Sequence, residues 1–196
     1  MAPRPPRLAV IAGPNGAGQS TAAPALMRDL LRIEQFVNAD AIAQGMSGFD
    51  PDAVAIAAGR AMLARLHELA AARRDFAFET TLASRSFAPW IAELRESGYQ
   101  FALVFLWLPS PEIAIARVAQ RVASGGHHVP ASTIRRRFDR GLANFFALYR
   151  PLAESWRVYG SSPAPRPRLI AHAGLNLTTR VLDEEAWNSL ESGYGA

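Results

Sequence analysis

A short glycine-rich stretch, GPNGAGQST at residues 13–21, limits what this chain can fold into more than any other part of the sequence. It matches the phosphate-binding P-loop pattern G-x-x-x-x-G-K-[ST] at Gly13, Gly18 and Ser20. The apolar run RLAVIAG leads into it and a helical stretch follows it, which is the strand–loop–helix context that a P-loop requires. The bland alternative is a glycine-rich turn that only joins a strand to a helix, and the context favours the phosphate-binding interpretation.

The loop backbone is predicted to hold the phosphates of a nucleotide. Successive N–H groups in such a loop converge on phosphate oxygens, and the Ser20 hydroxyl is the expected ligand of Mg²⁺. The predicted nucleotide-binding residues are Gly13, Pro14, Asn15, Gly16, Ala17, Gly18, Gln19, Ser20 and Thr21.

Gln19 stands where the pattern has lysine. Glutamine reaches about as far and can donate hydrogen bonds, but it carries no charge, and charge-assisted contacts are roughly twice as strong as neutral ones. We expect ATP to bind while phosphoryl transfer falls by about 10²–10⁴-fold, as for the loss of one electrostatic stabiliser.

The rest of the chain alternates between apolar runs and helical stretches. Such alternation predicts an open α/β sheet, mostly parallel, in three layers with helices on both faces, whose ligands bind beyond the carboxyl ends of the strands. The expected strands are 7–13, 35–40, 76–81, 99–108, 156–160 and 168–174, and the expected helices are 21–32, 50–75, 86–98, 110–126 and 130–151. We expect one domain over 1–196, with a lid at about 110–150 and a C-terminal tail, from about 176, that is a small helix or loose.

Composition narrows the class of protein further. The chain has 196 residues, no cysteine and a net charge of +4, and all 21 of its Lys and Arg residues are arginine. Without cysteine, neither a disulfide framework nor a thiolate metal site can form. No apolar run approaches the ~20 residues that cross a bilayer. We therefore expect a cytoplasmic protein with no membrane partner.

Carboxylates follow two of the expected strands. Asp40 in VNAD and Glu79 in FETT each lie where an expected strand ends, so both should face the ligand crevice of a parallel sheet. Phosphoryl transfer to an alcohol uses one carboxylate as base and usually another beside the metal, and we assign Asp40 to the first role and Glu79 to the metal or substrate side. Thr80 and Thr81 could bind substrate. The alternative makes Asp40 a helix cap and Glu79 an ion-pair partner.

Arginines gather on two helices joined by the stretch SGGHHVP. Arg117 and Arg121 are four residues apart and share a helix face, whereas Arg135, Arg136 and Arg137 cannot all point one way. A lid that closes on a triphosphate would use such arginines to neutralise developing charge. The alternative is a solvated basic face.

Two weaker signals carry no site. His127 and His128 are adjacent and lack the spacing of metal ligands, so we expect a structural role or a substrate contact at the lid. Nucleic acid is not the expected partner, because the basic run IRRRFDR is its one support.

The ordered set VIAGPNGAGQST, NAD, FETTLASRSF, the stretch from FLWLPSPEIAIARV to HHVP, and IRRRFDRGLANFFALYRPLAESWRVY resembles the short bacterial zeta-toxin-like P-loop proteins, over about residues 7–160. The resemblance implies a nucleotide-kinase-like fold and transfer of the γ-phosphate of ATP (or GTP), with Mg²⁺, to a hydroxyl of UDP-N-acetylglucosamine or a related sugar nucleotide. It also implies an antitoxin protein as a further partner.

By motif, Asp40 matches the base of that family, Glu79 and Thr81 match its substrate-side E-x-T, and Arg117 matches a phosphate-contacting arginine. One arginine of 135–137 matches a second such residue, and we place Arg136 with Arg85 on the substrate side. The assigned catalytic set is Asp40, Gln19, Arg117 and Arg121. The stretch VYGSS departs from the family's VYDNS-like ending.

Three explanations of Gln19 stay open. A lid arginine such as Arg121 supplies the missing charge, or the chain only binds nucleotide, or the lysine was deliberately replaced to silence a toxic enzyme. Intact motifs elsewhere favour the replacement, since decay would erode several positions. A kinase for another small metabolite and a regulatory nucleotide-binding module are the alternative functions.

Overall fold

The computed structural model describes residues 4–26, 31–126, 128–161, 167–174 and 178–192. They form a seven-stranded sheet in the order β2-β3-β1-β4-β5-β6-β7. The pairs among the first five strands are parallel, and β6 and β7 join antiparallel. The strands are β1 (Arg7–Ala12), β2 (Phe36–Val37), β3 (Phe76–Thr80), β4 (Gln100–Trp107), β5 (Ser155–Gly160), β6 (Arg168–Ala173) and β7 (Arg180–Val181).

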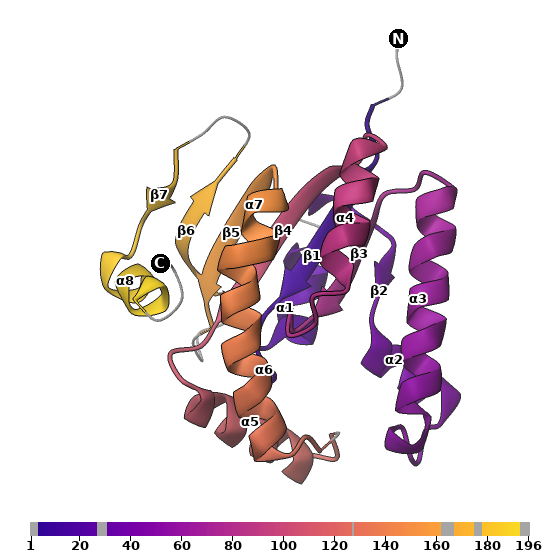
Figure 1. The fold of residues 1–196 in the computed structure, drawn as a ribbon. Coiled ribbons are helices and arrows are strands. Elements are labelled where there is room, and N and C mark those ends of the chain that lie inside the picture. Colours follow the sequence, from indigo (N-terminus) through magenta and orange to yellow (C-terminus); the bar gives the residue numbers. More distant parts are fainter. Residues whose placement is uncertain (1–3, 27–30, 127, 162–166, 175–177, 193–196) are drawn as a thin grey trace.

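Helices cover both faces of this sheet, as the sequence predicts (Figure 1). Helices α4 and α6 lie in front of the sheet in this view and α1 lies behind it. The helices are α1 (Gln19–Ala25), α2 (Ala39–Met46), η2 (Asp52–Val54, 3-10), α3 (Ala55–Ala71), α4 (Phe87–Glu96), α5 (Pro111–Ala123), α6 (Ala131–Asn144), η3 (Phe145–Tyr149, π), α7 (Arg150–Leu152) and α8 (Glu184–Glu191).

Apolar strands and aromatic helix faces make the core. Leu8, Val10 and Ala12 of β1 are fully buried, as expected for a strand covered on both faces. On the front face Phe78 packs against Phe87 of α4, with ring centroids 4.9 Å apart. Phe105 of β4 likewise packs against Phe145 of η3, with ring centroids 4.7 Å apart, so α4 and η3 pack on one face of the sheet.

Several element boundaries differ from the sequence prediction. The expected strand 35–40 is only Phe36–Val37, because the Asn38 side chain accepts a hydrogen bond from the Ala41 N–H and starts α2, an unpredicted helix. The expected helix 50–75 begins as a 3-10 turn and becomes α-helical at Ala55. The expected helix 21–32 begins at Gln19, and residues 27–30 of it lie outside the described residues.

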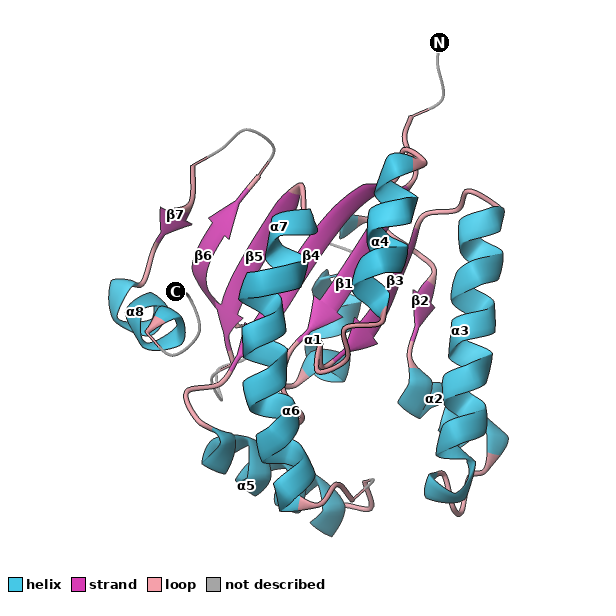
Figure 2. Cartoon of the chain, viewed as in Figure 1, coloured by secondary structure: helices cyan, strands magenta, loops and turns pink. Residues whose placement is uncertain are grey.

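The C-terminal region includes an ordered helix (Figure 2). The Asp183 side chain caps α8 by accepting from the Ala186 N–H. Trp187 of this helix is buried and stacks on Trp156 of β5, with centroids 5.6 Å apart and planes 13° apart. The tail from about residue 176 therefore contributes a helix that packs on the sheet.

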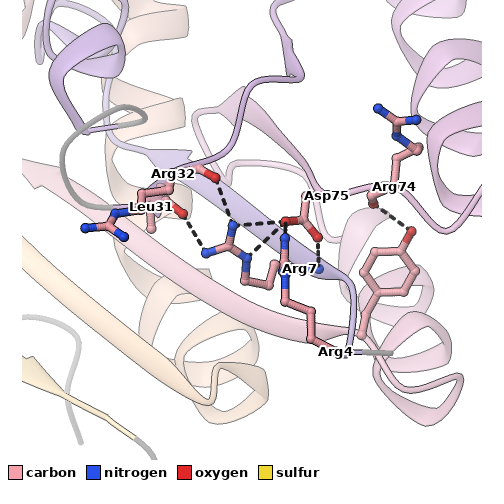
Figure 3. A network of polar contacts seen from close by, with 7 residues as sticks. Arg4, Arg7, Leu31, Arg32, Arg74 and Asp75 are labelled. Atoms are coloured by element: carbon pink, nitrogen blue, oxygen red, sulfur yellow. Dashed lines mark hydrogen bonds and ion pairs between the residues drawn. The ribbon is translucent and has the colours of Figure 1, made fainter. Parts of the chain in front are cut away.

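The amino ends of the strands are held by one charged cluster (Figure 3). The Arg7 guanidinium donates to Asp75 at 2.9 Å and to the carbonyls of Leu31 and Arg32 at 2.7 and 2.8 Å. Burial opposes ionisation of Asp75, but hydrogen bonds from Arg4 and Arg7 outweigh it and hold the pKa of Asp75 below its ordinary value. The cluster joins β1, the start of β3 and the segment that enters β2.

Candidate active site

The glycine-rich loop lies at the carboxyl end of β1, between the ends of β3 and β4 (Figure 2). The Gly13 N–H donates to the Thr80 carbonyl of β3 at 3.3 Å, and the Ala17 N–H turns back to the Pro14 carbonyl at 3.0 Å. The loop thus closes on itself and is tied to the neighbouring strand.

Gly16 is required by both conformation and space. Its φ is +80°, and an added Cβ would lie 2.9 Å from the Ala114 carbonyl oxygen and 3.1 Å from the Arg117 Cβ. Residues other than glycine seldom adopt this φ, and helix α5 fills the space beside Gly16. No larger residue therefore fits. Helix α5 therefore packs directly against the loop.

Ser161, directly after β5, links three segments around the loop. Its hydroxyl donates to the Ala17 carbonyl at 2.7 Å, and its N–H donates to the Trp107 carbonyl at the end of β4 at 2.9 Å. Arg117 of α5 donates to the Ser161 Oγ and carbonyl at 2.7 and 2.9 Å and reaches the Gly16 carbonyl at 3.4 Å. Arg117 therefore supports the loop directly at the Gly16 carbonyl and, through Ser161, at the Ala17 carbonyl.

Ser161 was not among the predicted site residues. The departure of VYGSS from the family ending was the available signal, and it cast doubt on a segment whose serine turns out to contact the loop.

Gln19 is buried and its amide is engaged. The side chain is 6% exposed, and Nε2 donates to the Thr80 carbonyl at 3.0 Å. Thr80 thus accepts from both Gln19 and the Gly13 N–H, so the residue at the lysine position ties α1 to the end of β3.

Ser20, Asn38 and Glu79 form a hydrogen-bonded group beside the loop. The Ser20 hydroxyl donates to Glu79 Oε2 at 3.1 Å, and Asn38 Nδ2 donates to the same oxygen at 2.7 Å. Because Asn38 also caps α2, three elements meet at this carboxylate. A serine hydroxyl and a carboxylate are oxygen donors of the kind that Mg²⁺ takes together with phosphate and water, so the group fits that ion.

The surroundings of Glu79 favour its neutral form. Burial raises the pKa of Glu79, and the nearby Asp40 raises it further, while hydrogen bonds from Ser20 and Asn38 and the charge of Arg121 act in the opposite direction. A cation bound at this carboxylate would instead lower the pKa of Glu79.

Asp40 lies in the first turn of α2 rather than at the end of a strand, which corrects the sequence prediction. The N-cap of that helix is Asn38, so the alternative prediction that Asp40 caps a helix is wrong. Its side chain is exposed and lines a cavity.

That cavity, of about 570 Å³, joins the loop to α2 and to the α5–α6 connection. Its size is typical of a site for a small molecule. Ser20, Asp40 and Arg121 line one continuous space, with Phe49, Asp50 and His128 farther along its wall. The arrangement brings Ser20 of the glycine-rich loop, a carboxylate and a guanidinium to one cavity. His127 lies outside the described residues.

Other predicted residues are placed differently. The hydroxyls of Thr80 and Thr81 accept from the N–H groups of Leu82 and Ala83 and so close the turn that follows β3. Thr21, Arg85 and Arg136 are exposed, and none of these three lines the cavity. Arg135 pairs with Glu112, which gives it a structural role between α5 and α6.

Two other depressions lie at the amino ends of the strands, away from the loop. One, of about 190 Å³, is lined by Leu8, Phe101 and Arg157, and the other, of about 480 Å³, by Arg4, Arg74 and other polar residues. Among the described residues, no group of three or more His, Cys, Asp or Glu could hold a metal ion. The same part of the chain has no helix long and apolar enough to span a membrane.

A glycine loop after the central strand of a mostly parallel sheet, with the sheet order β2-β3-β1-β4-β5, defines an α/β P-loop fold of the nucleotide-kinase type. Comparison with known families gives the family: residues 8–148 match an AAA domain family (AAA_33), and the chain belongs to it.

Individual proteins are also similar to this chain. An uncharacterized protein of Haemophilus influenzae is 29% identical over 126 residues, which are 64% of this chain and 88% of that protein. The AvrRxo1-ORF1:ORF2 complex with ATP superposes with a TM-score of 0.71 at 15% identity over 95% of this chain, which spans only 64% of that one.

Two further structures share the fold. A chain of the PezAT chromosomal toxin–antitoxin system of Streptococcus pneumoniae superposes with a TM-score of 0.65 at 13% identity, covering all of this chain and 81% of its own. A gluconokinase from Sinorhizobium meliloti superposes with a TM-score of 0.50 at 19% identity, over 83% of this chain and 86% of the gluconokinase chain. These neighbours confirm the predicted P-loop kinase-like fold.

Proposed function

We propose that this protein is a P-loop phosphotransferase that moves the γ-phosphate of ATP (or GTP) to a hydroxyl group of a small acceptor. The observation that carries the proposal is the 570 Å³ cavity, because it opens Ser20 of the loop and the Asp40 carboxylate onto the same space. A phosphoryl donor and an acceptor hydroxyl bound there would lie between the loop and a base.

Asp40 is the proposed general base. It is exposed, lies in the first turn of α2 and lines the cavity that would hold the acceptor. As the acceptor oxygen bonds to the γ-phosphorus and the bond to the leaving nucleoside diphosphate breaks, the hydroxyl proton passes to this carboxylate.

Ser20 and Glu79 would hold Mg²⁺ and its water ligands. Ser20 Oγ and Glu79 Oε2 are 3.1 Å apart, and the raised pKa of Glu79 would fall when a cation binds. The ion would neutralise charge on the phosphate oxygens.

The arginines divide into two groups. Arg121 lines the cavity, so it is the proposed cation that faces the transferred phosphoryl group, whereas Arg117 supports the loop from outside. Arg85 and Arg136 keep their proposed substrate role only if the lid closes over the cavity, because both are exposed. Thr80 and Thr81 would act through the turn they close.

The acceptor class and the partner rest on the zeta-toxin resemblance. A sugar nucleotide of the UDP-N-acetylglucosamine type is the proposed acceptor. Two similar folds come from complexes, AvrRxo1-ORF1:ORF2 and PezAT, which supports an antitoxin-like protein as the proposed partner. A cytoplasmic location follows from the proposed use of ATP.

A second function is a nucleotide-binding module without turnover. Gln19 favours it, because the residue at the lysine position donates to the Thr80 carbonyl and brings no charge. The loop backbone would still hold a nucleotide.

Incubation of the chain and of its Gln19→Lys variant with [γ-³²P]ATP, Mg²⁺ and a panel of hydroxyl acceptors separates the two functions. Labelled product with the variant, dependent on one acceptor, supports the phosphotransferase. ATP binding by both proteins with no labelled product from any acceptor would favour the binding module.

A further inference from the structure

The loop after β3 is held by a distant part of the chain. Residues 81–86 connect β3 to α4 and pass beside α6 (Figure 1). They directly follow the end of β3, where Glu79 accepts from the Ser20 hydroxyl and the Thr80 carbonyl accepts from the P-loop, so their placement sets the direction of this strand end.

Two side chains of the α6–η3 region bind the carbonyl groups of this loop. Asn144 Nδ2 donates to the Leu82 carbonyl at 2.7 Å, and the Tyr149 hydroxyl donates to the Ser84 carbonyl at 2.6 Å. Burial raises the pKa of Tyr149 to about 12, so the hydroxyl keeps the proton that it donates to Ser84.

Gly141 lets α6 come close to the same loop. A Cβ at this position would lie 2.4 Å from the Thr81 carbonyl oxygen, which is closer than any ordinary contact. Since the opposing atom belongs to the backbone, even alanine would push the loop away from the helix.

The loop conformation itself needs such support. Leu82 is fully buried and has φ +56°, a left-handed conformation that a branched side chain seldom adopts. Backbone conformations of this kind persist where the surroundings over-determine them.

The other side of the same segment is bonded to the P-loop. The Thr80 carbonyl accepts from the Gly13 N–H and from Gln19 Nε2. The strand end thus lies between the P-loop on one side and α6 on the other.

We propose that Asn144 and Gly141 are positioning residues that hold the Thr81–Leu82 turn, and through it Glu79, in the geometry that phosphoryl transfer needs. The proposal rests on the proposed phosphotransferase function. Neither residue touches the cavity; each acts through the carbonyl groups of the loop. Tyr149 fixes the far end of the same loop.

Hydrogen–deuterium exchange of Asn144→Ala and Gly141→Ala tests the anchoring without any need for activity. Loss of one hydrogen bond predicts about 3–10-fold faster exchange at residues 82–86. Gly59→Ala and Asn188→Ala are matched controls, since a Cβ at Gly59 meets nothing within 4 Å and Asn188 is exposed, and they should leave this loop unchanged. Unchanged exchange in the loop, or equal acceleration over the whole chain, would overturn the proposal.

Kinetics in the Gln19→Lys background test the positioning. With ATP and UDP-N-acetylglucosamine, Asn144→Ala should lower kcat by about 10–100-fold, as for a reactant displaced by about an ångström, with the ATP Kd unchanged. Asn144→Asp has the same shape but cannot donate to the Leu82 carbonyl, so it should match alanine, whereas Asn144→Gln should recover part of the rate.

Faster deuterium exchange at residues 82–86 with an unchanged kcat would overturn the inference. It would show that α6 holds the loop but that the loop does not position the site. If the Gln19→Lys parent transfers no phosphate to any acceptor, the proposed function fails, and the exchange experiment still decides whether α6 anchors the loop. Should Gly141→Ala not fold, Asn144→Asp carries both measurements.

Discussion

The Ser20 hydroxyl donates to Glu79 Oε2 at 3.1 Å and so connects the first turn after the P-loop to the end of the adjacent strand. The two residues are 59 positions apart in sequence, and the parallel pairing of β1 with β3 brings them together. This contact joins the two residues that we propose to hold Mg²⁺.

Gln19→Lys should raise phosphoryl transfer by about 10²–10⁴-fold, because it adds a charge where the phosphates bind. Initial rates with [γ-³²P]ATP measure the gain. Gln120→Lys, which adds the same side chain on an exposed position of α5, should give none. Ordinary kinase rates in the unchanged protein, with no gain from Gln19→Lys, would contradict the role given to this position.

Asp40→Asn should lower kcat by about 10²–10⁴-fold in the Gln19→Lys background, the usual contribution of a general base. The ATP Kd should stay the same, since Asp40 faces the acceptor side. Asp50→Asn is the control, because Asp50 lines the same cavity and asparagine can still accept from the Ala53 N–H. Equal losses in the two variants would argue against Asp40 as the base.

Glu79→Gln should remove a pH dependence of stability. The folded-state pKa of Glu79 is raised above the ordinary 4.5, so its stabilising contribution is complete below pH 4.5 and is lost as pH rises through the folded pKa. Urea unfolding in the absence of Mg²⁺ should therefore show the variant gaining stability relative to the parent as pH increases. A constant difference across that range would show that the pKa is not raised.

Ser161→Ala and Arg117→Ala should be strongly coupled. The Arg117–Ser161 contact is a charge-assisted hydrogen bond, so a double-mutant cycle on the free energy of unfolding should give an interaction of about 1–2 kcal/mol. Each single variant should also weaken ATP binding, because both residues support the loop carbonyls. Additive effects would mean that the two side chains act independently.

Asp75→Asn should destabilise the fold by about 1–3 kcal/mol, since Asp75 accepts hydrogen bonds from two guanidinium groups and is 19% exposed. The pKa of Asp75 is lowered, so this stabilisation should be lost as pH falls through the folded-state pKa. Glu68→Gln breaks an exposed pair with Arg65 and should cost less than about 1 kcal/mol.

Much of this molecule follows from local sequence patterns. The glycine loop and the nearly all-apolar β4 predict a parallel sheet with a P-loop, because strand burial and loop chemistry are both local properties. Helix α2 was not predicted, since its eight residues are too few to show a clear period. Its presence moves Asp40 from a strand end to a helical turn.

Local sequence patterns do not predict contacts between distant segments of the chain. Ser161 contacts the loop because β5 ends beside it, and the altered VYGSS ending indicated only a departure from the family, not a contact with the loop. Asn144 and Gly141 lie in a stretch that reads as ordinary helix, and their partners are about 60 positions away. The burial of Gln19 against Thr80 likewise depends on how β3 meets α1.

Helix α6 is fastened to the β3 loop near its carboxyl end and carries arginines near its start. At 1.5 Å per residue, Arg135 lies roughly 14 Å from Asn144 along the axis, so a tilt of about 5° at the fastened end would carry the arginine by about 1 Å. Helix α6 therefore connects the loop after β3 at one end to the Arg135–Glu112 pair with α5 at the other. A change in the packing of residues 81–86 that tilted the helix would displace that pair.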